Sequence, residues 1–376
     1  MRMRTPSRLL ATVSLVLAGA CGGSQPQAPA SPAASAAASI PPVASAPPPA
    51  AATASAAPAA PTPEEQKKAK AARELQEDRA KWEDENKTEL ARWTPELHAA
   101  AKALADKTYP SGQAALQAAI AGKHRKPGDA DRDKFRHPLQ TLEFFGFKPT
   151  LTVLEIGPGE GWYTELLAPA LAAKGKLIDT NSDPNGPADQ RSTFYGQRFK
   201  SFLDKAPELY GKVQTVVVDS KAPSLGLDGT VDLAVLMREA HGMVNNGTLN
   251  AWLASINKAL KPGGILGIEE HRAKADADPI ESSKKGYVPE KWLIDQVEAA
   301  GFKLVGKSEV NANPKDTKDY PEGVWTLPPS FALEGKDHDK YAAIGESDRM
   351  TLKFAKAPAP KAAAPKAATA PAAAKP

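Results

Sequence analysis

The sequence predicts an α/β fold in which a mostly parallel, seven-stranded sheet carries helices on both faces. Two observations favour this class. Short apolar stretches alternate with helical segments between residues 152 and 355. One stretch, at 153–156, leads directly into a turn that contains Gly157, Gly159 and Gly161. A strand that continues through a glycine turn into a helix is typical of sheets that bind ligands at the carboxyl ends of their strands.

The expected strands are short runs rich in aliphatic and β-branched residues. They span residues 152–156, 176–180, 213–218, 231–237, 265–268, 302–308 and 350–355. The run at 213–218 contains three consecutive valines, so we expect a buried strand there. Helices are expected between the strands, at 162–173, 190–203, 248–260 and 289–300. This alternation predicts parallel strands joined by right-handed crossovers.

A helical region is expected before the sheet. A threonine, a proline and glutamate follow one another at 62–64 and again at 94–96, and this order is typical of helix starts. The two helices should end near residues 92 and 106, and further helices are expected at 112–121 and 137–145. The first helix is highly charged, with few apolar residues. We therefore expect a solvated arm, and a coiled coil that binds a partner is the alternative.

Composition separates the two ends of the chain from its middle. The chain has 376 residues, 35 prolines and a formal net charge of +4. Residues 22–61 are dominated by Ala, Pro and Ser, and residues 357–376 by Ala and Pro with three lysines. Such segments bury too little apolar surface to fold. We expect a disordered linker and a disordered tail, which flank a helical arm at 62–124 and one globular domain at 125–356.

The first 21 residues have the features of an export signal. Three arginines lie within the first eight residues, and the apolar stretch at 9–20 is too short to span a bilayer. The stretch ends at Cys21, the only cysteine of the chain. Residues 17–21 resemble a bacterial lipoprotein signal, although Ala18 occupies a position where a larger aliphatic residue is usual. The resemblance implies lipidation of Cys21, a membrane anchor and a location in the bacterial cell envelope, facing the periplasm or the exterior. A cleaved secretory signal and a cytoplasmic protein are the alternatives.

The glycine turn has a specific form. A dinucleotide-binding turn reads G-x-G-x-x-G, whereas the third glycine here, Gly161, comes one position too early. The form E-x-G-x-G at 155–159 resembles the first motif of class I S-adenosylmethionine-dependent methyltransferases. The segment LKPGG at 260–264 resembles the turn before the fifth strand of that family. The resemblance covers about residues 125–356, whose C-terminal third is similar to a group of bacterial methyltransferases that are often exported. A dinucleotide-binding or other α/β domain is the alternative.

The resemblance implies a Rossmann-like class I methyltransferase fold, S-adenosylmethionine as the cofactor, and methyl transfer to an unidentified, small-molecule acceptor. It also implies the cofactor-binding residues: Glu155 at the loop, Gly157, Gly159 and Gly161 along the methionine and ribose, Asn181 at the ribose, Asp219 at the adenine, and Arg238 at the tip of the fourth strand. The family has an acidic residue where this chain has Asn181, and an amide binds a hydroxyl without a charge-assisted bond. For Asp219, a role in a turn is the alternative.

Two histidines follow neighbouring expected strands. His241 comes after the fourth strand and His271 after the fifth. Because the carboxyl ends of parallel strands share one edge of a sheet, we expect both side chains beside the glycine loop. They are the predicted catalytic residues, one of them as proton acceptor, and a structural role is the alternative. Metal binding by the two histidines and nearby glutamates is an alternative, but their spacing fits no compact ligand motif, so no metal is predicted.

Two further segments are candidates for the walls of the site. Arg132 and His137 precede the first strand, where many methyltransferases fold a segment over the cofactor, and surface salt bridging is the alternative. The loop at 311–348 is long for a connection between strands, and its aromatic residues, Tyr320 and Trp325, favour order. We expect it to form a lid or a wall of the substrate site.

The function has alternatives of a different class. S-adenosylmethionine is a cytoplasmic metabolite, so an exported enzyme would need its own supply. A non-enzymatic, exported ligand-binding lipoprotein that retains the fold is therefore the main alternative, and an envelope protein acting through its basic tail is a weaker one. Nucleic acid is not expected as a partner, because the lysines of the tail lack interleaved aromatic residues. The sequence leaves the oligomeric state open.

Overall fold

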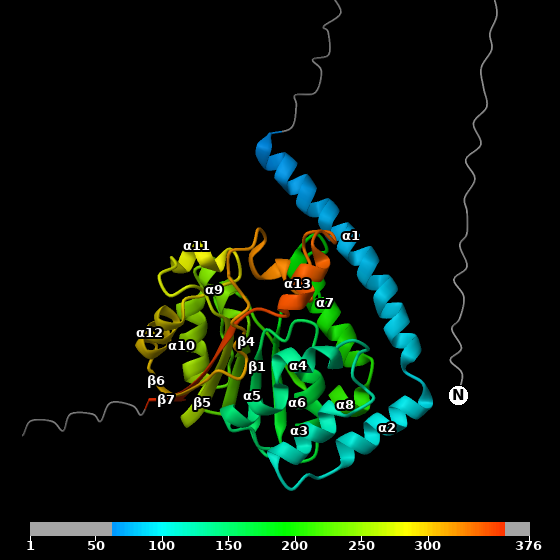
Figure 1. The fold of residues 1–376 in the computed structure, drawn as a ribbon. Helices are drawn as coiled ribbons and strands as arrows, with labels where there is room; N and C mark the ends of the chain where they lie inside the picture. The colour runs from blue at the N-terminus through cyan, green and yellow to red at the C-terminus, as the bar shows by residue number, and fades with distance from the viewer. Residues whose placement is uncertain (1–61, 358–376) are drawn as a thin grey trace, which may run out of the picture. The chain divides into compact units, whose positions relative to one another are not determined.

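The computed structural model describes residues 62–357 (Figure 1). The predicted signal at 1–21 with Cys21, the linker at 22–61 and the tail from residue 358 onward lie outside these residues. Within residues 62–357, no helix has the length and apolar character needed to cross a bilayer.

Seven strands form one sheet in the order β3-β2-β1-β4-β5-β7-β6. β1 to β5 pair in parallel, and β7 runs antiparallel between β5 and β6. The strands are β1 (Thr152–Ile156), β2 (Lys176–Asn181), β3 (Gln214–Val217), β4 (Val231–Met237), β5 (Leu260–His271), β6 (Phe302–Ser308) and β7 (Arg349–Lys356). The prediction of a mostly parallel, seven-stranded α/β sheet is confirmed.

Among the described residues, the eight predicted helices are present to within two residues at each end, together with five short helices that the sequence did not predict (Figure 1). They are α1 (Pro63–Arg92), α2 (Pro95–Asp106), α3 (Gly112–Ile120), α4 (Asp133–Arg136), α5 (Pro138–Phe145), α6 (Thr164–Leu171), α7 (Arg191–Asp204), α8 (Pro207–Tyr210), α9 (Ala240–Asn245), α10 (Leu249–Ala259), α11 (Pro279–Ser283), α12 (Glu290–Ala299) and α13 (His338–Ile344). Two short 3₁₀ helices, η1 (Ala130–Arg132) and η2 (Gly323–Thr326), complete the described residues.

Alternation along the strands divides the core between the two faces of the sheet. Leu154 and Ile156 of β1 pack in a cluster with residues of α9, α10 and α12. Val153, between them in the chain, packs on the other side with residues of α2, α3, α5 and α6. Successive side chains of a strand point to opposite faces of the sheet. Because helices cover both faces, the side chains on both faces are buried, and the central strands are continuous apolar runs in the sequence.

The helix α1 is docked rather than fully solvated, which corrects the expectation of a free arm. Trp82 packs edge-on against Phe194 of α7, with ring centroids 5.8 Å apart. Near the C-terminus of the helix, the buried Glu89 carboxylate lies 3.1 Å from the ammonium of Lys205. The aromatic contact and the buried ion pair, with further hydrogen bonds such as that from Arg79 to Gln197, attach a helix whose apolar stripe alone predicted little contact.

Three local differences from the prediction have physical causes. β3 pairs only with β2, so as an edge strand it is largely exposed; Val217 is 54% exposed, and the prediction of a buried strand is wrong. The LKPGG segment belongs to β5 itself, where Gly263 (φ +74°) accompanies a shift in register against β4. The short helix α9 begins within the segment that the sequence predicted as a strand tip.

Candidate active site

The three glycines of the loop after β1 have different surroundings. All three have positive φ, at +63°, +60° and +86°. A Cβ atom on Gly157 would lie 2.8 Å from Cγ of Glu239, and one on Gly161 would lie 2.5 Å from the ring of Phe202. A Cβ on Gly159 would meet no atom within 4 Å. Packing therefore requires Gly157 and Gly161, whereas Gly159 faces open space at the carboxyl end of β1.

Glu155 lies beneath this loop rather than in it. Its carboxylate accepts a hydrogen bond from the Thr164 hydroxyl at 2.9 Å, which links β1 to the first residue of α6. Asp179 of β2 is its buried neighbour. Burial raises the pKa of Glu155 to about 7, and burial together with the charge of Glu155 raises the pKa of Asp179 well above its ordinary value. The Glu155 carboxylate thereby ties the end of β1 to the start of α6.

The predicted ribose and adenine residues stand at the ends of β2 and β3. The side-chain amide of Asn181 donates to the carbonyl oxygen of Gly196 at 3.2 Å. Asp219 is exposed, and its Oδ1 accepts the backbone N–H of Lys221 at 2.9 Å, so it closes a turn. Asp219 therefore has the role in a turn that was the alternative for it. Cofactor contacts of Asn181 and Asp219 stay predictions.

Arg238 is held by a buried glutamate at the end of the next strand. Its backbone is left-handed (φ +60°), a strained conformation for this residue. Its Nη1 donates to Glu269 of β5 at 3.2 Å. The Tyr163 hydroxyl donates to the same carboxylate at 2.8 Å, and Nε of Arg349 lies 2.9 Å from it. Glu269 is thus the centre of a buried network that the sequence did not reveal.

A second glutamate extends this network into the long loop at 311–348. Arg132 and Arg136 place their Nε atoms 3.0 and 3.1 Å from the carboxylate of Glu346, and Arg349 donates to it as well. The predicted alternative for Arg132, salt bridging, is what the structure shows, although the ion pair is largely buried. His137, the other candidate of that segment, lies with Nδ1 3.2 Å from Oδ1 of Asn311. The segment before β1 is thereby joined to the long loop.

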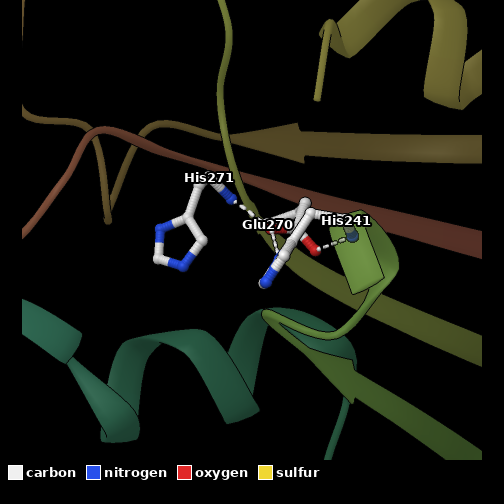
Figure 2. Close-up of side chains that lie close together, drawn as sticks. All are labelled: His241, Glu270 and His271. Atoms are coloured by element: carbon white, nitrogen blue, oxygen red, sulfur yellow. Dashed lines mark hydrogen bonds and ion pairs between the residues drawn. The ribbon is translucent and has the colours of Figure 1, made fainter. Parts of the chain in front are cut away.

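The structure brings the two predicted histidines together around a glutamate (Figure 2). Nδ1 of His241 lies 3.0 Å from Oε1 of Glu270, and the His241 backbone N–H donates to Oε2 at 3.1 Å. The His271 backbone N–H donates to Oε1 at 2.8 Å. The two imidazole centroids are 5.5 Å apart, and Nδ1 of His271 lies 2.5 Å from Oγ of Ser347.

The electrostatic surroundings of the two rings differ. Burial favours the neutral form of both, but the Glu270 carboxylate outweighs burial at His241 and raises its pKa. Burial, together with the charges of His241 and Arg349, places the pKa of His271 well below its ordinary value. Glu239, which the sequence analysis passed over, lies beside both Gly157 and this pair, and burial raises its pKa to about 7.

The long loop lies beside the histidines. The indole of Trp325 in η2 makes an edge contact with the ring of His241 at 5.9 Å, and it is 40% exposed. Tyr320 is buried against Tyr341 of α13, with ring centroids 5.8 Å apart. The loop is ordered, as predicted. Through Trp325 it lies directly beside the histidine pair.

Comparison with known proteins gives one family match and a set of similar solved structures. Residues 129–306 match the family model described as a methyltransferase domain. No curated protein matches the chain.

Among solved structures, the chain is similar to a SAM-dependent methyltransferase from Aquifex aeolicus (18% identity, TM-score 0.41, covering 61% of this chain and 94% of that chain). It is also similar to the [4+2]-cyclase SpnF (17% identity, TM-score 0.45, covering 66% and 97%) and to the glycopeptide N-methyltransferase MtfA, solved with S-adenosylhomocysteine (14% identity, TM-score 0.38, covering 60% and 90%). The family match covers residues 129–306, and the mostly parallel, seven-stranded sheet with a glycine loop after β1 is the Rossmann-like α/β fold of methyltransferases.

Proposed function

We propose that this domain transfers the methyl group of S-adenosylmethionine to a small-molecule acceptor. The observation that carries the proposal is the open space at Gly159, at the carboxyl end of β1, within a methyltransferase domain. Methyl transfer requires little covalent chemistry from the protein, because the sulfonium carbon is already electrophilic. The protein must hold the acceptor atom in line with that carbon and exclude competing geometries.

Within this proposal the backbone of the glycine loop contacts the methionine and ribose, Asn181 the ribose hydroxyls, and Asp219 the adenine amine. Asn181 and Asp219 follow β2 and β3, which lie next to β1 in the sheet. Arg238 is bound to Glu269 at the end of β4 and would face the same edge. These positions support the assignments, because ligands of such sheets bind beyond the carboxyl ends of adjacent strands.

Thermal unfolding of the full chain tests the cofactor class. A ligand present at about 100 times its Kd stabilises the native state by about 2.7 kcal/mol. S-adenosylhomocysteine at that level should therefore raise Tm by roughly 5–10 °C. NAD⁺ should leave Tm unchanged. A rise with NAD⁺ alone would favour the dinucleotide alternative, and no rise with either would favour a binding protein for another ligand.

We propose that His241 and His271 line the acceptor pocket. Once an acceptor is known, His241→Ala and His271→Ala should each reduce turnover by roughly 10²–10⁴-fold if the ring removes or stabilises a proton. Binding of S-adenosylhomocysteine should be retained, because neither residue belongs to the glycine loop. His98→Ala, on α2, is the control and should turn over normally. Normal turnover in both site variants would exclude the catalytic role.

We propose further that the protein is anchored in the cell envelope by lipid on Cys21. The arginines, the apolar stretch and the single cysteine at the N-terminus support this. Cys21→Ser should move the protein from the membrane fraction to the soluble fraction of the native host. Mass spectrometry of the mature N-terminus provides the direct check, since an unprocessed Met1 would contradict the export model.

A further inference from the structure

We propose that His241, Glu270 and His271 form a binding site for one divalent transition-metal ion. The three side chains offer two imidazole nitrogens and a carboxylate oxygen, and one such atom from each lies within 4.8 Å of the others (Figure 2). Two histidines and one glutamate are the protein ligands of several catalytic zinc sites. The inference rests on the proposed function only for its place beside the acceptor pocket, because ion binding requires no methyl donor.

The fold explains how residues 29 and 30 positions apart converge. β4 and β5 are parallel neighbours, and Met237 pairs with Glu269. Glu270 and His271 are the last residues of β5, whereas His241 lies in the first turn of α9, directly after β4. The spacing in sequence matches no compact metal-binding motif, so the cluster becomes visible only when the two strands are paired.

Hydrogen bonds hold both imidazoles by the same ring nitrogen. Nδ1 of His241 lies against Glu270, and Nδ1 of His271 lies against Ser347. Nε2 of His271 is therefore left for an ion, and metal-bound histidines typically have their second nitrogen fixed in this way by a carboxylate, a carbonyl or a hydroxyl group. At His241, an ion that Glu270 also binds would take the place of the proton on Nδ1. Of the Glu270 oxygens, Oε2 accepts one hydrogen bond, from the His241 backbone, and can be shared with an ion.

The distances require only a modest contraction. Ligands of a tetrahedral ion with bonds of about 2.0–2.1 Å lie roughly 3.3 Å apart, so the atoms must approach by an ångström or slightly more. The charge balance favours a cation. Arg238 and Arg349, whose charges act on His271, are both paired with Glu269. Glu239 adds a second carboxyl group next to Glu270.

Three protein ligands leave a fourth position of a tetrahedral ion for water or for the acceptor. An acceptor hydroxyl or thiol bound there would lose its proton to solvent more readily, because coordination stabilises the ionised form. The ring lone pairs would then be used by the ion, so ionising the acceptor would be the role of the metal rather than of a histidine.

Titration calorimetry with Zn²⁺ on the full chain, after dialysis against a chelator, tests the site. We expect one ion per chain, with at least a 10-fold loss of affinity in His241→Ala and in His271→Ala. His338→Ala is the matched control, because that histidine is exposed on α13. This variant should bind Zn²⁺ as tightly as the wild-type chain. Co²⁺ should give visible d–d absorption that both site variants lose.

The same metal-free protein is titrated with S-adenosylhomocysteine, so that failure of the metal site is distinguishable from failure of the cofactor site. If a histidine variant does not show a native circular dichroism spectrum, Glu270→Gln, which preserves the shape of the side chain, is used in its place. Glu270→Gln should also bind Zn²⁺ more weakly than the wild-type chain. The proposal is overturned if the wild-type chain binds no Zn²⁺, if the site variants bind it as tightly, or if binding depends on Cys21 instead.

Discussion

Gly159→Val should lower the affinity for S-adenosylhomocysteine by at least 100-fold while the domain remains folded. The new side chain would enter the space in which no protein atom lies within 4 Å, at the carboxyl end of β1. A branched side chain there would occupy the volume that the methionine or ribose portion of the cofactor needs. Titration calorimetry gives the affinity, and circular dichroism shows whether the fold is retained.

Backbone strain must be separated from blocking of the ligand, because valine is unfavourable at positive φ. Gly229→Val provides the matched control. Gly229 has φ of +62°, against +60° for Gly159, and a Cβ there also meets no atom within 4 Å. Gly229 precedes β4, at the amino ends of the parallel strands, whereas the glycine loop lies at their carboxyl ends. The Gly229→Val variant should therefore bind S-adenosylhomocysteine with normal affinity. Equal affinity in both variants would show that the glycine loop is not the cofactor site.

Arg349→Met should destabilise the chain by about 3–5 kcal/mol, because it leaves two buried carboxylates without their shared partner. The side chain of Arg349 is 2% exposed and bridges Glu269 of β5 to Glu346 of the long loop. Its guanidinium also donates to the carbonyl oxygen of Phe135, in the segment before β1. Urea unfolding measures the loss.

A surface ion pair should behave differently. Lys291 forms an i,i+4 pair with Asp295 at 2.8 Å, and its side chain is 86% exposed. Lys291→Met should change stability by less than about 1 kcal/mol, since exposed pairs are largely screened. A similarly small effect for Arg349→Met would mean that the buried network contributes little to holding the loop against the domain.

The sheet could be predicted from sequence because its central strands carry unbroken apolar runs bounded by glycine or charge. β1 and β4 begin and end at the predicted residues. β3 shows the limit of this argument. Its valines are as β-branched as those of a central strand, but exposure depends on whether another strand pairs beyond it, and no local pattern contains that information.

The site could be predicted only in part, for a similar reason. His241 and His271 could be placed together because both follow parallel strands. Their partners depend on β7, which returns antiparallel between β5 and β6 and brings Ser347 and Arg349 to the site from the far end of the chain. The different roles of the glycines could not be predicted either, because the ring that leaves no room for a Cβ on Gly161 belongs to Phe202 of α7, a later element of the chain.

A crystal structure of the full chain with S-adenosylhomocysteine would locate the cofactor site. We expect one ligand at the carboxyl ends of β1 and β4, in contact with Gly159, with its sulfur directed toward the pocket that His241 and His271 line. A ligand bound away from the glycine loop, or none at a concentration that saturates the calorimetric titration of other methyltransferases, would contradict this expectation.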